Sequence, residues 1–128
     1  MTEITSKKRP KHLDLINIYF PLAAKASILH RISGAGLFLF FPVLLCLFGD
    51  SLASPEGFDN FKSIAALWPV KIVLAGLIWA FLHHFCMGIR FLLLDLHIGI
   101  GKEASRRSAA AVLAVSISLS LILWGVLL

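Results

Sequence analysis

The chain has 128 residues, of which 59% are hydrophobic, and its mean hydropathy is +0.89. A soluble domain of this size cannot bury so much apolar surface, so the composition excludes a soluble globular protein. The net charge of +5 comes from basic residues at the ends of apolar segments, a placement typical of membrane topology rather than of nucleic-acid binding.

A basic, polar tail opens the chain, and residues 1–22 are expected to lie in the cytoplasm. Four basic residues cluster between positions 7 and 11 of this tail. No short apolar region with a small-residue cleavage site follows, so the sequence does not predict a cleaved signal peptide. Tyr19 and Phe20 suit the aromatic belt at a membrane interface.

Three stretches of about 18 residues or more contain no Asp, Glu, Lys or Arg, and they predict three transmembrane helices. At about 1.5 Å of rise per residue, each comes near the ~30 Å hydrocarbon core of a bilayer. Helices are required there because their backbone polar groups are satisfied within the segment. The expected helices cover about 23–49, 67–97 and 106–128, separated by connections at 50–66 and 98–105.

The distribution of Lys and Arg predicts the orientation. Three basic residues lie between positions 102 and 107, whereas the connection 50–66 carries only Lys62. The N-terminus and the second connection are therefore expected in the cytoplasm. The first connection and the C-terminus are expected in the periplasm, with the helices in a bacterial inner membrane.

Two smaller features concern packing and local structure. In the first connection the string SPEG predicts a short surface helix, because Ser54 can cap it and Pro55 suits its first position. Cys46 and Cys86 lie in different apolar segments without metal-binding spacing, so we interpret them as packing residues.

The first helix carries polar residues that a bilayer makes costly. Ser27, His30, Arg31 and Gly34 follow the spacing i, i+3, i+4, i+7, which predicts one helix face near the cytoplasmic end. This face is typical of a pocket for an anionic or carbonyl-bearing ligand, with Gly34 leaving room for a bulky group. An arginine anchored at the interface beside a capping serine explains the same residues about equally well.

The second helix carries the string HHFCMGIRFLLLD. His83 and His84 point about 100° apart on a helix, so they cannot both ligate one metal. Gly88, one turn after His84, gives a flat macrocycle space against the helix, which suits an axial haem ligand. A histidine hydrogen-bonded to a neighbouring helix is the alternative, and the commoner one for a single membrane histidine. Arg90 and Asp95 lie near the cytoplasmic end, where Arg90 holds haem propionates or simply marks the interface.

The two polar sets lie at the same depth, in the cytoplasmic halves of their helices. A haem near His84 and a ligand near Ser27 and Arg31 would be neighbours, as short-range electron transfer requires. His30 and His84 can bind one iron only if the first two helices pack to allow it. A six-coordinate haem b is therefore expected to take its second histidine from another subunit.

Two strings together resemble a known family, the cytochrome b556 subunits that anchor succinate dehydrogenase in the membrane. They are SILHRISG at Ser27–Gly34 and HxxxGIRxLxxD at His84–Asp95. RPKHLDL at Arg9–Leu15 and SPEG at Ser54–Gly57 also match the bacterial pattern. The resemblance covers almost the whole chain and implies an all-α, three-helix unit that forms half of a heteromeric helix bundle.

The resemblance implies a subunit of succinate:ubiquinone oxidoreductase, the respiratory complex II of the tricarboxylic acid cycle. Succinate is oxidised on a flavin in the flavoprotein subunit, and electrons pass through the iron–sulfur subunit to ubiquinone. By resemblance, His84 is the axial ligand of haem b, and a second membrane anchor subunit supplies the other ligand. Ser27 and Arg31 line the ubiquinone site, and His30 and Arg31 lie near the haem propionates. No residue of this chain is expected to act on succinate.

One position departs from the family pattern, because Phe91 stands where some relatives carry a histidine that reaches a propionate. Two other functions stay open at this point. The first is a menaquinone-type fumarate reductase anchor, and the second is a non-redox membrane assembly or transport protein. The second predicts no haem and no soluble partners.

Overall fold

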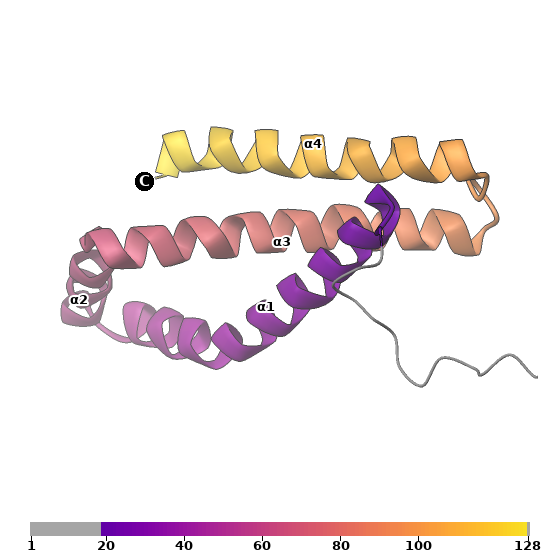
Figure 1. Ribbon diagram of the computed structural model, residues 1–128. Helices are drawn as coiled ribbons and strands as arrows, with labels where there is room; N and C mark the ends of the chain where they lie inside the picture. Colours follow the sequence, from indigo (N-terminus) through magenta and orange to yellow (C-terminus); the bar gives the residue numbers. More distant parts are fainter. Residues whose placement is uncertain (1–18, 128) are drawn as a thin grey trace, which may run out of the picture.

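Four α-helices make up the computed structural model, which describes residues 19–127 (Figure 1). Three are long and apolar enough to cross a membrane: α1 (Leu22–Ala53), α3 (Trp68–Asp95) and α4 (Lys102–Leu127). The shorter α2 (Pro55–Ala66) connects α1 to α3. The start of α1, the end of α3 and the start of α4 lie at one end of the unit, as three successive membrane crossings require.

Part of the N-terminal prediction lies outside the described residues. The basic cluster at positions 7–11 and the motif RPKHLDL both precede residue 19. The last residue of the expected third helix, Leu128, also falls outside. The predicted cytoplasmic tail therefore stays a prediction.

The first helix is bent and runs past its expected end. α1 changes direction part-way along its length (Figure 1), and Pro42 is the only proline inside it. A proline inside a helix removes one backbone hydrogen bond and clashes with the preceding turn, which bends the helix. α1 continues to Ala53, beyond the expected end near position 49. It ends where Pro55 favours an extended conformation for Ser54 (φ −157°, ψ 161°).

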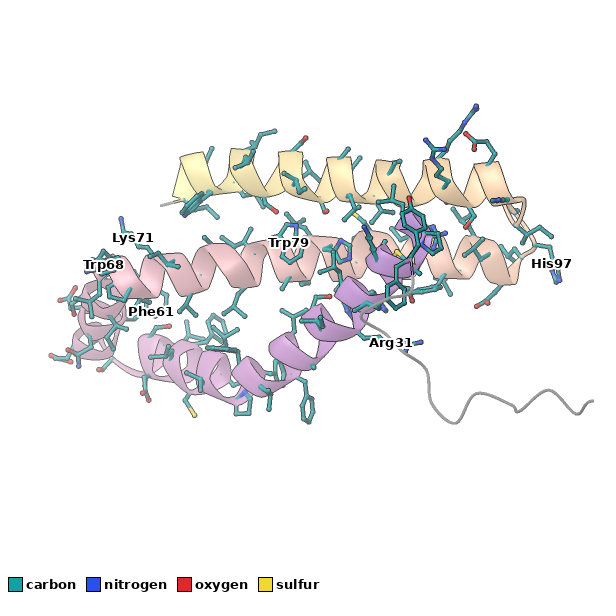
Figure 2. The ribbon with its side chains drawn as sticks, in the orientation of Figure 1. Arg31, Phe61, Trp68, Lys71, Trp79 and His97 are labelled. Atoms are coloured by element: carbon teal, nitrogen blue, oxygen red, sulfur yellow. The ribbon has the colours of Figure 1, made fainter. Side chains whose placement is uncertain are left out.

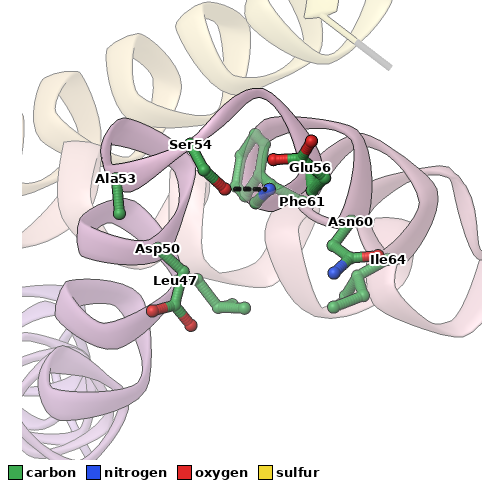
Figure 3. A pocket seen from close by; sticks show the side chains of 9 residues that line it. Leu47, Asp50, Ala53, Ser54, Glu56, Asn60, Phe61 and Ile64 are labelled. Atoms are coloured by element: carbon green, nitrogen blue, oxygen red, sulfur yellow. Dashed lines mark hydrogen bonds between the residues drawn. The ribbon is translucent and has the colours of Figure 1, made fainter.

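The surface helix that the SPEG string predicts is present as α2. The Ser54 hydroxyl oxygen accepts a hydrogen bond of 3.0 Å from the Gly57 N–H, drawn as a dashed line in Figure 3, and Pro55 occupies the first turn. The corner between α1 and α2 is tight, because a Cβ at Gly57 would collide with the main-chain carbonyl oxygen of Asp50. Glycine is required there by the close approach of the two backbones.

The turn between α3 and α4 is shorter than expected. α3 ends at Asp95, and His97 (φ 61°) and Gly99 (φ 78°) both adopt the left-handed conformation. α4 begins at Lys102, before the expected start near 106, and an ion pair of 3.1 Å between Arg107 and Glu103 supports its polar first turns. The length of an apolar stretch underestimates the length of a helix that continues beyond the hydrocarbon core.

Small residues mediate the packing of the three long helices. Ala109, Val112 and Ser116 of α4 are buried, together with Met87 of α3 and Ala26 of α1. Small side chains let helix backbones approach closely in a membrane, where no hydrophobic effect drives helices together. Most large apolar side chains of the described residues face outward, as contact with lipid or another membrane chain requires.

Arg90 joins α3 to α4 near the shared end. Its side chain is 6% exposed, and its Nε donates to the Ser108 hydroxyl at 2.9 Å. Its Nη2 donates to the Ser105 hydroxyl at 2.8 Å and to the Ser105 carbonyl at 3.2 Å. Within residues 19–127 no carboxylate forms a salt bridge with it. Arg90 thus makes interhelical hydrogen bonds, rather than simply marking the membrane interface.

Removing both serine hydroxyls should loosen this contact. In a Ser105→Ala/Ser108→Ala variant the buried guanidinium loses two acceptors, at an expected cost of about 1–3 kcal/mol. Thermal unfolding of the purified assembly in detergent, followed by tryptophan fluorescence, measures the loss. Ser118→Ala, an exposed serine of the same helix, is the control. Equal melting temperatures for the double variant and the control would contradict the role of Arg90.

Replacing either of two glycines near the end of α1 with alanine should change the stability of the protein, in opposite directions at the two positions. Gly57→Ala forces the α1–α2 corner apart and should destabilise the protein by about 1–3 kcal/mol. Gly49→Ala meets no atom within 4 Å and should stabilise the helix by about 0.5–1 kcal/mol. The same thermal measurement compares the two variants, and a Gly57→Ala protein as stable as wild type would refute the close approach.

Candidate functional site

The side chain of His84 lies against α1. Its Nδ1 is 3.1 Å from the main-chain carbonyl oxygen of His30 and 3.4 Å from the Ser33 hydroxyl. The Ser33 hydroxyl itself donates to the same His30 carbonyl at 2.9 Å. A carbonyl oxygen only accepts hydrogen bonds, so His84 must carry its proton on Nδ1. The lone pair of Nε2 is then available to a ligand.

The neighbouring His83 holds the opposite tautomer. Its Nε2 is 3.3 Å from the carbonyl oxygen of Ala26, so Nε2 carries the proton. The His83 side chain is fully buried and stacks on Trp79, with ring centroids 5.3 Å apart. Its Nδ1 is enclosed and has no hydrogen-bond partner among the described residues. His83 therefore fastens α3 to α1, one helical turn from the contact that His84 makes.

The His30 ring packs between His84 and Phe91. The His30 ring stacks on His84, with centroids 4.0 Å apart and planes 9° from parallel. Phe91 meets His30 edge-on at 5.1 Å between centroids. A Cβ at Gly34 would lie 2.7 Å from Cε1 of His84, so the room that Gly34 leaves is taken by that ring.

The four residues expected on one face of α1 divide into two pairs. His30 and Gly34 contact α3, whereas Ser27 is half-buried and Arg31 is exposed. Figure 2 shows the Arg31 side chain pointing away from α3. Neither Ser27 nor Arg31 has a hydrogen bond or ion pair from its side chain within residues 19–127. Both lie within one turn of His30.

Ser33 and the carbonyl oxygens of Ala26 and His30 are site groups that the motif analysis did not single out. Ser33 is 4% exposed, although it lies within the string SILHRISG. Ala26, His30 and Ser33 recur at i, i+4 and i+7, so helical spacing alone could have placed them on one face. The partner of that face depends on how α1 rotates against α3, which spacing does not give.

Among residues 19–127, two hollows lie away from His84, and the one between α3 and α4 is mostly apolar. An open hollow lies at the α1–α2 corner, where Asp50, Glu56 and Asn60 contribute polar groups (Figure 3). It lies at the far end of α1 from His30 (Figure 1). Within residues 19–127 no group of three or more His, Cys, Asp or Glu side chains could hold a metal ion.

Comparison with known proteins agrees with the resemblance in the motifs. Residues 5–123 match the model of a family described as the succinate dehydrogenase/fumarate reductase transmembrane subunit. The chain belongs to this family. The chain is similar to the succinate dehydrogenase cytochrome b556 subunit of Coxiella burnetii, which is 37% identical over 93% of this chain and 95% of its own length.

Two further relatives carry the same name. The protein of Rickettsia prowazekii is 32% identical over 97% of this chain and 99% of its own length. That of Paracoccus denitrificans is 29% identical over 95% of this chain and 94% of its own. Membership of this family, together with the three apolar helices, makes the chain a multi-pass membrane protein. The expected fold class is thereby confirmed.

Proposed function

We propose that this chain is the membrane-anchoring cytochrome b subunit of a succinate:ubiquinone oxidoreductase. In this role it ligates haem b and borders the ubiquinone site. With a second anchor subunit it holds the iron–sulfur and flavoprotein subunits at a bacterial inner membrane. The names of the relatives support the overall role. The observation that carries the residue assignment is the hydrogen bond from His84 to the His30 carbonyl.

The chemistry of His84 fits an axial haem ligand. A histidine that binds a metal generally donates its other ring N–H to a carbonyl or carboxylate, which sets the tautomer and raises the basicity of the ligating nitrogen. His84 does this through Nδ1 and leaves Nε2 unprotonated. When bound, haem b supplies one-electron transfer. His83 lacks this arrangement, because its Nε2 is engaged with Ala26 and its Nδ1 is enclosed by protein.

The stacking of His30 on His84 supports a second ligand from another chain. Two axial ligands approach an iron from opposite sides, with their nitrogens in line through the metal. Parallel rings 4.0 Å apart, face to face, present their nitrogens side by side instead. In this arrangement His30 cannot complete the coordination of an iron bound to His84. His30 therefore lies beside the proposed axial ligand His84. This position is compatible with the expected place of His30 near the haem propionates.

Ser27 and Arg31 suit a quinone headgroup. The Ser27 hydroxyl can donate a hydrogen bond to a quinone carbonyl oxygen. The guanidinium of Arg31 can stabilise the negative charge that develops on a quinone oxygen during reduction. Their side chains have no partner within residues 19–127, and both lie within a turn of His30, whose ring contacts His84. A quinone at Ser27 and Arg31 would therefore lie close to a haem at His84, as electron transfer between the two requires.

The proposed orientation has support from the position of basic residues. Lys102, Arg106 and Arg107 are exposed at the start of α4, at the end of the unit where α1 begins (Figure 1). Basic residues favour the cytoplasmic side of a membrane. His84, Ser27 and Arg31 then lie in the cytoplasmic half. A fumarate reductase anchor using menaquinone is the second candidate, since the family description covers both enzymes.

The adjacent histidines provide a matched test of the haem ligand. His84→Ala should abolish the dithionite-reduced b-type band of the purified complex, because the Nε2 donor is lost. His83→Phe keeps a ring on Trp79 and leaves the Nε2 of His84 in place, so it should retain the band even though the hydrogen bond to Ala26 is lost. The optical spectrum per mole of complex measures both. A His84→Ala complex with the wild-type band would refute the ligand assignment.

The quinone site can be tested at Arg31. Arg31→Ala removes a charge-assisted contact and should lower succinate–quinone activity about 10- to 100-fold, since such contacts contribute roughly 1.5–3 kcal/mol. Succinate oxidation by an artificial acceptor should stay near wild type, because that electron path bypasses the membrane subunit. Lys25→Ala removes an exposed cation from the same helix and serves as the control. Parallel losses in both assays would point to damaged assembly and contradict the proposal.

A further inference from the structure

The imidazole ring of His84 is held by α1 from several sides. A Cβ at Gly34 would lie 2.7 Å from Cε1 of that ring, closer than real Cβ atoms approach a neighbour, and 3.1 Å from Nδ1. The His30 ring covers one face at 4.0 Å between centroids. Nδ1 is directed at the His30 carbonyl, with the Ser33 hydroxyl oxygen 3.4 Å away. The ring can neither turn nor tilt freely without losing one of these contacts.

We propose that Ser33 and Gly34 are positioning residues that set the orientation and the basicity of the His84 ring, and through them the reduction potential of the haem. This inference rests on the proposed haem ligation by His84. Neither residue touches the haem iron in this account. Each acts through the ring that does.

Gly34 controls orientation by steric limits. Any larger side chain at this position must push the His84 ring away from α1, because Cε1 of the ring lies 2.7 Å from where the Cβ would be. The His30 ring already covers one face of the His84 ring. Because that face is blocked, we expect the displacement to rotate the His84 ring about its side-chain bonds as well. Two residues along α1, a Cβ at Gly36 would meet no atom within 4 Å. Of these two glycines, only Gly34 is required to be small by the neighbouring His84 ring.

Ser33 controls basicity through the shared carbonyl. Its hydroxyl and the His84 Nδ1–H both donate to the His30 oxygen, at 2.9 Å and 3.1 Å. A carbonyl that already accepts one hydrogen bond is a weaker acceptor for the next. Ser33 is 4% exposed, so no bulk water replaces its hydroxyl when that group is removed. Without it the Nδ1–H bond strengthens, the ring becomes a stronger electron donor, and oxidised iron is favoured.

Ser33→Ala and Gly34→Ala, compared with Gly36→Ala in the full complex, test the inference. Ser33→Ala should shift the midpoint potential of the haem to a more negative value, and Ser33→Thr, which keeps the hydroxyl, should restore it. Gly34→Ala should change the low-temperature EPR g-values of the oxidised haem, which depend on the orientation of the axial imidazoles. Gly36→Ala should match wild type in both measurements.

The outcomes separate this inference from the proposed function. Wild-type potential and g-values in both Ser33→Ala and Gly34→Ala would overturn the positioning role, while loss of haem in His84→Ala would leave the ligand assignment standing. A wild-type haem spectrum in His84→Ala would overturn both. If Gly34→Ala fails to assemble, the potential of Ser33→Ala, a change of one atom, decides the question.

Discussion

Two carbonyl oxygens of α1, one turn apart, accept hydrogen bonds from two adjacent histidines of α3, and the site is built around these bonds. A helical carbonyl oxygen can accept a side-chain donor as well as the N–H of its own helix, so Ala26 and His30 can bind the histidines without breaking α1. In a bilayer no water competes for these groups, and a buried imidazole must find its partner within protein. The bonds therefore set how α1 and α3 meet.

The opposite tautomers of the two histidines follow from this contact. Adjacent residues on a helix point in different directions, and His83 and His84 contact separate turns of α1 through different ring nitrogens. His83 donates its Nε2–H to α1 and encloses its other nitrogen inside the bundle. His84 donates its Nδ1–H and leaves Nε2 unprotonated. A structural histidine and a candidate ligand thus stand side by side in the chain.

The helices could be predicted well from the sequence, and the relations between helices poorly. Uninterrupted apolar stretches predict three spans, and a proline with a capping serine predicts α2, because these signals act within one segment. Arg90 shows the limit. Its partners Ser105 and Ser108 lie on another helix, and their pairing depends on how α3 and α4 are rotated. In the same way, helical spacing grouped Arg31 with His30, but it could not show that only His30 faces α3.

The Arg90 contact also bears on how the protein enters the membrane. An arginine within a membrane-spanning segment is costly, and close hydrogen-bond acceptors lower that cost. Here the acceptors come from the next helix along the chain, after a turn that begins at Leu96 and ends at Gly101. α3 and α4 can therefore leave the insertion machinery as a finished hairpin, with the guanidinium already paired. α1 contacts this hairpin through the histidines, so the candidate haem side of the subunit depends on a contact between α1 and α3 that the hairpin alone does not contain.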